Sequence, residues 1–398
     1  MAMRPLVLKA YTATSCIGRG LAATWDSLLE RRSGLAPCDF ETAELDTHIG
    51  RVDGVDVQRL PADLRKFQCR NNRLAELALQ QDGFFDAVEH AAERWGRRRI
   101  GVFLGTSTAG ILQTELAYRE RDPVSGALPP SFEYAATHNS FSVADYVRQR
   151  CRLEGPAVAV SCACASSAKV FASARRMIEA DVIDAALVGG VDSLCLTTLY
   201  GFHSLQLSSP TPCRPFDVAR DGISIGEAGA FALLERMPED AGDAVMLLGI
   251  GESSDAYHMS APHPEGLGAR RAMQSALAAA ALEPGAIDYI NLHGTGTPSN
   301  DRAESQAVTS VFGPTTPCSS TKGATGHTLG AAGALEAVIS ALVLTHGLMP
   351  GGVHTATLDP TLTAHYIKEN HRAPVSRVLS NSFGFGGTNC SLIFGRAE

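Results

Sequence analysis

Two kinds of hydrophobic segment alternate along the chain. Short segments are almost wholly apolar, such as Ile100-Gly101-Val102-Phe103-Leu104, and this pattern is typical of strands that are buried on both faces. Long, alanine-rich segments lie between them and are typical of helices. The alternation predicts a layered α/β fold with helices on both faces of the sheet. The expected strands are residues 4–9, 99–105, 156–161, 184–190, 244–250, 287–292 and 376–381, and the expected helices are residues 20–31, 71–93, 141–152, 165–181, 266–282, 301–312 and 330–346.

Two segments interrupt this pattern. Residues 106–140 are the least patterned part of the chain and contain three prolines. Residues 237–243, with the sequence Met-Pro-Glu-Asp-Ala-Gly-Asp, form a short polar seam. We place a boundary at this seam, between an N-terminal half, residues 1–240, and a C-terminal half, residues 241–398. We expect that the two halves do not fold independently.

The composition is that of an ordinary globular protein. The chain has 398 residues, of which 45% are hydrophobic and 19% charged, and it is long enough for two domains or one large two-part domain. Its net charge of −8 disfavours general nucleic-acid binding. No apolar run reaches the roughly 18 residues of a membrane span, and the first apolar stretch is too short for a signal peptide. We therefore expect a cytoplasmic protein.

Cys164 stands out among the ten cysteines. In a reducing cytosol most cysteines are small buried apolar residues, and none here forms a CxxC pair. Cys164, however, lies where an expected strand turns into an expected helix, and the positive end of a helix dipole stabilises a thiolate. This position predicts a thiol pKa lowered from about 8.5 into the range of about 3.5–7.5, and so a nucleophile. Cys162 is the competing candidate, but it lies inside the strand.

Two histidines lie in loops of glycine and threonine, where α/β sheets place their sites. His293 opens the segment His-Gly-Thr-Gly-Thr-Pro, and His327 lies within Thr-Gly-His-Thr-Leu-Gly. No carboxylate or third histidine falls at ligand spacing, so we expect no metal. Neutral imidazoles suit hydrogen bonding to an oxygen that gains charge. Lys322 and Glu304 are either an ion pair that tunes His327 or two surface charges, and spacing alone does not choose between these.

A glycine-rich segment near the C-terminus, residues 381–389, has two interpretations. The pair Gly386-Gly387 suits a tight hairpin turn between two apolar strands. Phe383 and Phe385 beside a glycine hinge suit instead a gate on an apolar tunnel. The glycine spacing does not fit a dinucleotide loop, and we expect no cofactor.

Together these motifs resemble the β-ketoacyl-[acyl-carrier-protein] synthases of the type I/II group, over nearly the whole chain. Residues 213–217 (Cys-Arg-Pro-Phe-Asp), 220–222 (Arg-Asp-Gly) and 226–229 (Gly-Glu-Ala-Gly) resemble the middle signature of that family. The resemblance implies the thiolase fold, a layered α-β-α-β-α arrangement of two similar halves. The N-terminal half would carry the nucleophile and the C-terminal half both histidines.

The resemblance also implies a reaction and its residues. Cys164 would accept an acyl chain from acyl carrier protein. His293 and His327 would promote decarboxylative Claisen condensation with malonyl carrier, giving a 3-oxoacyl carrier, with Lys322 paired to Glu304 in support of His327. The backbone N–H groups of Cys164 and Phe385 would form an oxyanion hole, and Phe385, with Phe383 behind it, would form a gate.

The resemblance implies three further roles. Glu304 and Asp301 would support the site, and Thr295 and Thr297 would contact the phosphopantetheine arm. Arg65, Lys66 and Arg70 would form a docking patch for the carrier protein.

The resemblance further implies a homodimer or a heterodimer with a related chain, with the strand before the nucleophile near the interface. Thr108 stands where fatty-acid elongating relatives carry glycine or isoleucine in the acyl pocket, and Lys169 stands where some carry histidine. Residues 134–139, which include Thr137 and His138, are polar for a segment that helps to close the acyl pocket across the dimer. At these positions the sequence resembles the synthases of aryl polyene pathways, which extend conjugated chains.

Three other protein classes are alternatives to this one. Thiolases need a second cysteine in a C-terminal Cys-x-Gly loop, whereas Cys390 is followed by serine and leucine. Type III condensing enzymes use Cys-His-Asn, and the segment from Lys322 to His327 favours the two-histidine class. The third is a non-catalytic partner that sets chain length in a ketosynthase heterodimer. Such partners lack the nucleophile, which is present here as Cys164.

Overall fold

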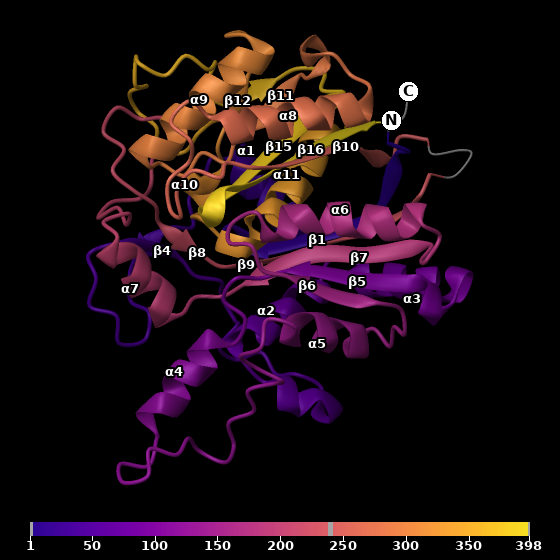
Figure 1. Cartoon of the computed structure of the whole chain (residues 1–398), viewed down its shortest axis with the longest axis vertical. Coiled ribbons are helices and arrows are strands. Elements are labelled where there is room, and N and C mark those ends of the chain that lie inside the picture. The colour runs from indigo at the N-terminus through magenta and orange to yellow at the C-terminus, as the bar shows by residue number, and fades with distance from the viewer. Residues whose placement is uncertain (1–2, 238–241, 397–398) are drawn as a thin grey trace.

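One continuous path of hydrogen-bonded strands runs through the computed structural model, which describes residues 3–237 and 242–396. Its order is β12-β11-β15-β16-β10-β1-β9-β7-β5-β6, with the short β2 beside β1 (Figure 1). At the centre, β1 and β10 pair at Leu6↔Leu247 and Val7↔Met246. The strands of this path are β1 (Leu6–Ser15), β2 (Gly18–Arg19), β5 (Ile100–Gly105), β6 (Ala157–Val160), β7 (Ala185–Asp192), β9 (Ala228–Arg236), β10 (Val245–Ser254), β11 (Tyr289–Asn291), β12 (Cys318–Ser319), β15 (Arg377–Gly384) and β16 (Thr388–Arg396).

The two sides of the central contact have the same topology. Counted outward, the N-terminal side is β1-β9-β7-β5-β6 and the C-terminal side is β10-β16-β15-β11-β12. Each side therefore uses its first, fifth, fourth, second and third strand in that order. In both, the two inner pairings are antiparallel and the two outer pairings are parallel. The chain is built from two similar halves, as expected.

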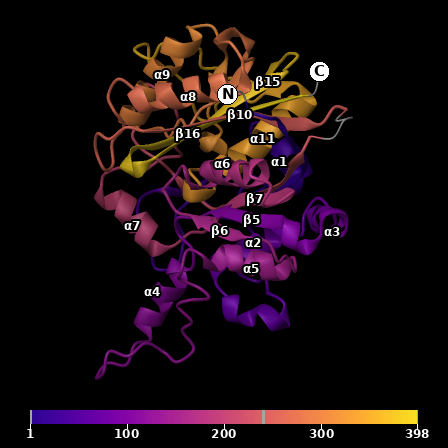
Figure 2. The same cartoon turned by 45° about the vertical axis from the view of Figure 1, so that its right-hand side comes forward.

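Helices form three layers around the strands (Figures 1 and 2). Helices α6 and α11 lie between the halves, since α6 packs on β5 and β7 while α11 packs on both β9 and β15. Helices α2, α3 and α5 cover the outer side of the N-terminal half, and α8, with α9 against it, covers the C-terminal half. The expected α-β-α-β-α layering is confirmed. The helices are α1 (Gly20–Leu29), α2 (Arg70–Leu79), α3 (Phe84–Trp95), α4 (Ile111–Arg119), α5 (Ser142–Arg150), α6 (Ser166–Glu179), α7 (Leu196–Ser204), α8 (Leu267–Ala280), α9 (Pro298–Phe312), α10 (Lys322–Thr325) and α11 (Ala332–His346), and the short strands outside the main path are β3 (Ala36–Pro37), β4 (His48–Gly50), β8 (Ile225–Gly226), β13 (Leu348–Met349) and β14 (His371–Arg372).

The first turns of α6 and α11 touch each other. A side chain at Gly333 would come within 2.6 Å of the backbone nitrogen of Ala168, so the absence of a side chain allows this close approach. The N–H of Ala334 also donates to the Ser167 hydroxyl at 2.9 Å. Cys164 lies just before α6 and His327 just before α11. Contact between the helix N-termini therefore brings the two loops together.

Most expected elements are confirmed, with ends that differ by a few residues. The expected helix 71–93 is instead two helices, α2 and α3, because Asp82 and Gly83 adopt left-handed conformations (φ 55° and 65°) that end a right-handed helix. The unpatterned segment 106–140 contains α4. The structure also has β9 and α7, which the sequence pattern did not predict. The boundary expected near residue 240 falls on residues 238–241, outside the described residues.

One segment, Leu329–His346, is long and apolar enough to cross a membrane by length and composition. It is not an uninterrupted apolar run, because it contains Glu336 and Ser340 and ends with Thr345 and His346. In the structure 89% of this segment is buried inside the protein. It includes α11, which contacts strands of both halves and the α6 helix, and a helix packed on all sides is apolar on all sides. The segment is a core helix.

Candidate active site

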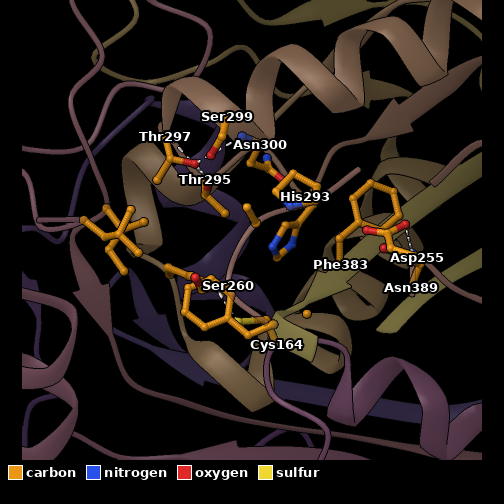
Figure 3. A pocket seen from close by; sticks show the side chains of 17 residues that line it. Cys164, Asp255, Ser260, His293, Thr295, Thr297, Ser299, Asn300, Phe383 and Asn389 are labelled. Carbon is orange, nitrogen blue, oxygen red and sulfur yellow. Dashed lines mark hydrogen bonds between the residues drawn. The ribbon is translucent and has the colours of Figure 1, made fainter. Parts of the chain in front are cut away.

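A small cavity lies where the loops after β6 and β11 meet the hairpin between β15 and β16. Its volume is about 60 Å³, which is room for a few water molecules. Figure 3 shows the side chains that line it, with Phe383 beside His293 and Cys164 below them. Segments separated by more than a hundred residues thus contribute to one site. The lining residues include Cys164, Leu207, Ile223, Asp255, Ser260, His293, Thr295, Thr297, Asn300, His327, Phe383, Phe385 and Asn389.

A sharp turn before α6 places Cys164 at this cavity. Ala163 has φ 54°, and a non-glycine residue in this conformation stores strain on the order of 1–3 kcal/mol. The hydroxyl of Ser166 holds the turn, since it accepts a hydrogen bond from the N–H of Cys162 at 2.9 Å and donates to the carbonyl of Ala163 at 2.5 Å. The Cys164 side chain reaches the cavity, and Cys162 is not among the residues that line it.

Both expected histidines lie beside the Cys164 sulfur. The Nε2 atom of His327 is 3.0 Å from Sγ of Cys164. The rings of His293 and His327 meet edge to face, with centroids 5.2 Å apart. One donor atom from each of the three residues lies within 4.8 Å of the other two. The fold therefore assembles three side chains that also bind metals, which spacing along the chain did not reveal.

The expected lowering of the Cys164 pKa is wrong. Burial raises the pKa of this thiol to about 12, and the charge of Lys322 offsets only part of that rise. Burial, with Lys322 acting in the same direction, lowers the pKa of both His293 and His327 well below the usual value. At neutral pH the site holds a neutral thiol and two neutral imidazoles. A reactive thiolate must then form by proton transfer, and His327 is within reach to accept the proton.

Lys322 pairs with Glu336 and not with Glu304. Its Nζ donates to Oε1 of Glu336 on α11, and both side chains are almost fully buried. Burial raises the pKa of Glu336 to about 7, and the ammonium of Lys322 opposes this rise. The expected Lys322–Glu304 pair is therefore wrong. Glu336 lies one turn inside α11, and only the packing of that helix against the loop shows that it is the acid within reach.

Two buried carboxylates of α9 hold the His293 loop. Glu304 accepts hydrogen bonds from the backbone N–H groups of His293 at 2.8 Å and Gly294 at 2.7 Å. Asp301 accepts from the N–H groups of Gly296 at 3.2 Å and Phe216 at 2.9 Å. The two acids are three residues apart, so they share one face of the helix. Burial raises the pKa of Glu304 to about 7.

Asp192, at the end of β7, is a further residue of the site that the sequence motifs do not indicate. Its carboxylate is fully buried and accepts hydrogen bonds from the backbone N–H groups of Ser107 (2.7 Å) and Thr108 (2.9 Å) and from the Thr106 hydroxyl (2.7 Å). It also accepts from the N–H of Gly330 at 2.6 Å, three residues after His327. One carboxylate thus joins the loop after β5 to the loop that carries His327. The only sequence signal is an acid at the end of an apolar strand.

The glycine-rich segment is both a hairpin turn and a wall of the cavity. Gly386 and Gly387 have φ 80° and 76° and connect β15 to β16. Phe383 lies with its ring 5.7 Å from that of His293. Phe385 packs on the Phe202 ring at 5.6 Å and also lines the cavity. The hairpin turn is therefore confirmed, and the gate on an apolar tunnel stays a prediction.

The side chains expected to contact the carrier arm lie at the cavity. Thr295 and Thr297 line it, with their hydroxyl oxygens 2.9 Å apart. The side chains expected in an acyl pocket lie elsewhere in this chain. Thr108 donates to Asp192 at 2.9 Å, Thr137 donates to the carbonyl of Glu133 at 2.7 Å, and the Nδ1 atom of His138 meets the Thr114 hydroxyl at 2.5 Å.

The expected docking patch is only partly at the surface. Arg65 and Lys66 are exposed, and the Lys66 ammonium lies 4.9 Å from the centroid of the Phe67 ring. Arg70 is 2% exposed and binds Glu227 through two hydrogen bonds, with a further ion pair to Asp56. Its inclusion in a docking surface is wrong. The sequence of basic residues does not show which side chain points into the protein. Here Arg70 points inward because it pairs with Glu227, a buried acid between β8 and β9.

Comparison with known proteins identifies the family. The model of the β-ketoacyl synthase N-terminal domain matches residues 3–240, and that of the β-ketoacyl synthase C-terminal domain matches residues 244–356. The chain belongs to the β-ketoacyl synthase family. It is an acyltransferase of the condensing type, which forms a carbon–carbon bond between acyl thioesters.

Individual relatives cover almost the whole chain. The 3-oxoacyl-[acyl-carrier-protein] synthase 2 of Coxiella burnetii is 31% identical over 100% of this chain and 99% of its own length. A chain in the structure of ketosynthase ApeO in complex with its chain length factor ApeC, from Xenorhabdus doucetiae, is 38% identical with a TM-score of 0.90, and the match covers 99% of this chain and 98% of that one. A β-ketoacyl synthase from Burkholderia phymatum is 30% identical with a TM-score of 0.87, and both chains are covered in full.

Proposed function

We propose that this β-ketoacyl synthase carries its acyl chain on Cys164 and condenses it with malonyl-acyl carrier protein to give 3-oxoacyl-acyl carrier protein. The single observation that carries the assignment of roles is the 3.0 Å contact between the Cys164 sulfur and Nε2 of His327. Both side chains are nearly buried yet line a cavity. A nucleophile and a base within hydrogen-bond reach are the arrangement that covalent acyl transfer requires.

Acyl transfer begins with the neutral thiol. As the Cys164 sulfur attacks the acyl thioester, its proton passes to Nε2 of His327, and the resulting imidazolium returns it to the departing carrier thiol. A new carbon–sulfur bond replaces the old one, so no charge remains in the buried site. The negative oxygen of the tetrahedral intermediate is assigned to the backbone N–H groups of Cys164 and Phe385. A side chain at Gly384 would lie only 3.3 Å from the nitrogen of Cys164, which supports this pairing of segments.

Condensation uses both imidazoles as hydrogen-bond donors. Loss of CO₂ from the malonyl group leaves an enolate, whose oxygen is stabilised by N–H groups of neutral His293 and His327. The enolate carbon then attacks the acyl carbonyl on Cys164, and the sulfur leaves as a thiolate, which takes up one proton from solvent to restore the neutral thiol. Burial keeps both rings neutral. Each ring can therefore donate a hydrogen bond without repulsion between its own charge and the ammonium of Lys322. The ammonium of Lys322 beside them adds positive potential where the oxygen becomes negative.

We assign to the hairpin at Phe385 the role of a gate that opens the cavity to an acyl chain. A cavity of about 60 Å³ cannot hold an acyl chain, so some side chain has to move before loading. Phe385 is half-buried at a turn whose neighbour Gly386 is exposed, and a ring on a glycine turn moves at lower cost than one fixed in a strand. We assign the phosphopantetheine arm to the side of the cavity lined by Thr295 and Thr297.

A second chain is assigned to the free edge of β6. In the part of the chain that the structure describes, β6 pairs with β5 alone, and all four of its apolar residues are half-buried. Such an edge accepts a strand from a partner. Since a chain in the ApeO–ApeC complex is 38% identical to this one, we infer a heterodimer with a chain length factor, in which this chain supplies Cys164. A homodimer is the alternative.

The substrate is assigned to conjugated acyl chains of the aryl polyene kind, delivered on acyl carrier protein. The assignment depends on the polar sequence around Thr137 and His138 and on Thr108, and in the structure these side chains bond to neighbouring residues and do not line the cavity. Carrier docking is assigned to the exposed cations Arg65 and Lys66, which suit an acidic partner. We place the protein in the cytoplasm, because its ten cysteines are all free thiols and suit a reducing compartment.

The test is an extension assay with a panel of acyl carriers and malonyl carrier, run with this chain alone and with its co-purified partner. We expect a 3-oxoacyl product longer by one two-carbon unit, with conjugated primers used in preference to long saturated ones. The Cys164→Ala variant should give no product, and the matched Cys162→Ala variant should retain it. Equal use of saturated chains would contradict the substrate class. Product formation by Cys164→Ala would contradict the proposed function.

A further inference from the structure

We propose that the cavity is also a reversible binding site for Zn²⁺, held by Cys164, His293 and His327 in place of an acyl chain. One donor atom from each of these residues lies within 4.8 Å of the others, and the Cys164–His327 pair is separated by 3.0 Å. All three side chains are at least nine-tenths buried and come from three different loops. Thiolate and imidazole are the ligands that Zn²⁺ prefers, and they exclude Mg²⁺ and Ca²⁺, which bind oxygen.

The geometry is close to that of a three-ligand zinc site. Tetrahedral Zn²⁺ with bonds of about 2.3 Å to sulfur and about 2.0–2.1 Å to nitrogen sets its protein ligands about 3.3–3.6 Å apart. A separation of 4.8 Å has to close by about 1.2–1.5 Å to reach this value, which rotation of an imidazole about its side-chain bonds provides. The adjoining cavity of about 60 Å³ leaves space for a water molecule as the fourth ligand.

The surrounding charges do not exclude a cation. The charge of Lys322 acts on all three side chains, and its ammonium is paired with the carboxylate of Glu336. The carboxylate of Asp192 acts on the Cys164 thiol with the opposite sign to Lys322. Binding replaces the S–H bond of Cys164 with a Zn–S bond and releases one proton to solvent, because a coordinated thiol is deprotonated.

The site lacks the outer contacts of a permanent zinc site. The Nδ1 atoms of His293 and His327 are both buried, and neither has a hydrogen-bond partner among the residues that the structure describes. Ligating histidines usually donate from the second nitrogen to a carboxylate or carbonyl, and loss of that contact weakens metal binding about 10–100-fold. We therefore infer a reversible inhibitory occupant. It competes with acyl loading, because both use the same sulfur.

Cobalt titration of the full-length protein under anaerobic conditions tests this inference without any assay of condensation. Co²⁺ reports a thiolate ligand through a sulfur-to-metal charge-transfer band in the near ultraviolet. We expect the band with wild type at one Co²⁺ per chain, its loss on addition of Zn²⁺, and the same behaviour in the matched Cys162→Ala variant. We expect no band in Cys164→Ala, or in wild type whose Cys164 has been alkylated with iodoacetamide, and Zn²⁺ binding weakened about 100-fold or more in both.

Two results would overturn the inference. One is a charge-transfer band that persists in Cys164→Ala or in the alkylated protein, because the thiolate would then belong to another cysteine. The other is a wild-type protein that gives no band with a several-fold excess of Co²⁺ while its circular dichroism shows it to be folded. The alkylated wild type keeps the test valid if a variant does not fold. Neither result depends on whether the protein condenses acyl chains.

Discussion

The Nε2 atom of His327 lies 3.0 Å from the sulfur of Cys164, although the two residues are 163 positions apart. The contact follows from the internal symmetry of the fold. Cys164 comes after β6 and before α6, and His327 comes after β12 and before α11. These are equivalent positions in the two halves, and the helix N-termini touch at Gly333 and Ala168. Cys164 and His327 are thus placed by one repeated structural unit.

The first prediction concerns the pH dependence of Cys164 alkylation. Because burial raises the pKa of this thiol to about 12, the rate of reaction with iodoacetamide should keep rising from pH 6 to pH 9 with no plateau. A thiolate with a lowered pKa would give a constant rate above about pH 7.5. Mass-spectrometric quantification of the modified Cys164 peptide distinguishes the two curves, and a plateau near neutral pH would mean that helix dipole and Lys322 outweigh burial.

The two histidines should differ in the step that they affect. Loss of one donor to a developing enolate costs about 2.7–4 kcal/mol, or about 100–1000-fold in rate. We therefore expect His293→Asn to slow condensation by this factor while acyl loading changes less than about threefold, since His327 contacts the sulfur. His327→Asn should slow both steps. Rapid-quench measurement of acyl-enzyme and product separates them, and equal effects of both substitutions on loading would contradict this division.

Asp192 should be a positioning residue. It accepts hydrogen bonds from the loop after β5 and from Gly330 beside His327, and an amide in its place would turn an N–H₂ group toward a donor. Because an unsatisfied buried group of this kind costs about 1–3 kcal/mol, Asp192→Asn should lower the free energy of unfolding in urea by that amount.

The same Asp192→Asn substitution should also lower kcat for condensation more than it raises KM, since the loops that carry the reacting groups lose a shared contact. Asp184→Asn is the matched control. Asp184 binds Arg99 near the surface, where an ion pair contributes at most about 1 kcal/mol. If the two variants behave alike, Asp192 has no special effect on the site.

Lys322 and Glu336 should behave as a coupled pair. Removing one partner of a buried ion pair costs about 3–5 kcal/mol, whereas replacing both with apolar residues is often neutral. Lys322→Met should therefore lower the free energy of unfolding by about that amount, and the double variant Lys322→Met/Glu336→Leu should recover most of it. Condensation should not recover with stability, because the charge beside the imidazoles remains absent. Full recovery of activity in the double variant would show that Lys322 has only a structural role.

The buried Arg70 and the exposed Lys66 should separate folding from carrier binding. Arg70→Ala leaves Glu227 buried without its guanidinium, so it should lower the free energy of unfolding by about 3–5 kcal/mol. Lys66→Glu should leave stability within about 0.5 kcal/mol and raise KM for acyl carrier protein several-fold. Thermal denaturation and carrier-dependent kinetics measure the two effects, and an unchanged KM in Lys66→Glu would remove this residue from the docking surface.

The proximity of Cys164 to both histidines could be predicted from the sequence, because each of the three lies at a junction between a strand and a helix. Such junctions gather at one edge of a sheet. The partner of Lys322 could not be predicted from the sequence, because Glu304 and Glu336 are both acids on helices near the histidine loops. The protonation state of Cys164 could not be predicted from the sequence either. A helix N-terminus lowers a thiol pKa and burial raises it, and only the structure shows how deeply the sulfur is buried.

Intact-protein mass spectrometry with an acyl carrier donor tests the central claim most directly. The account predicts that wild type gains the mass of one acyl group, that peptide mapping places it on Cys164, and that Cys164→Ala gains none while Cys162→Ala is loaded as wild type is. An acyl group on any other residue, or a loaded Cys164→Ala protein, would contradict it.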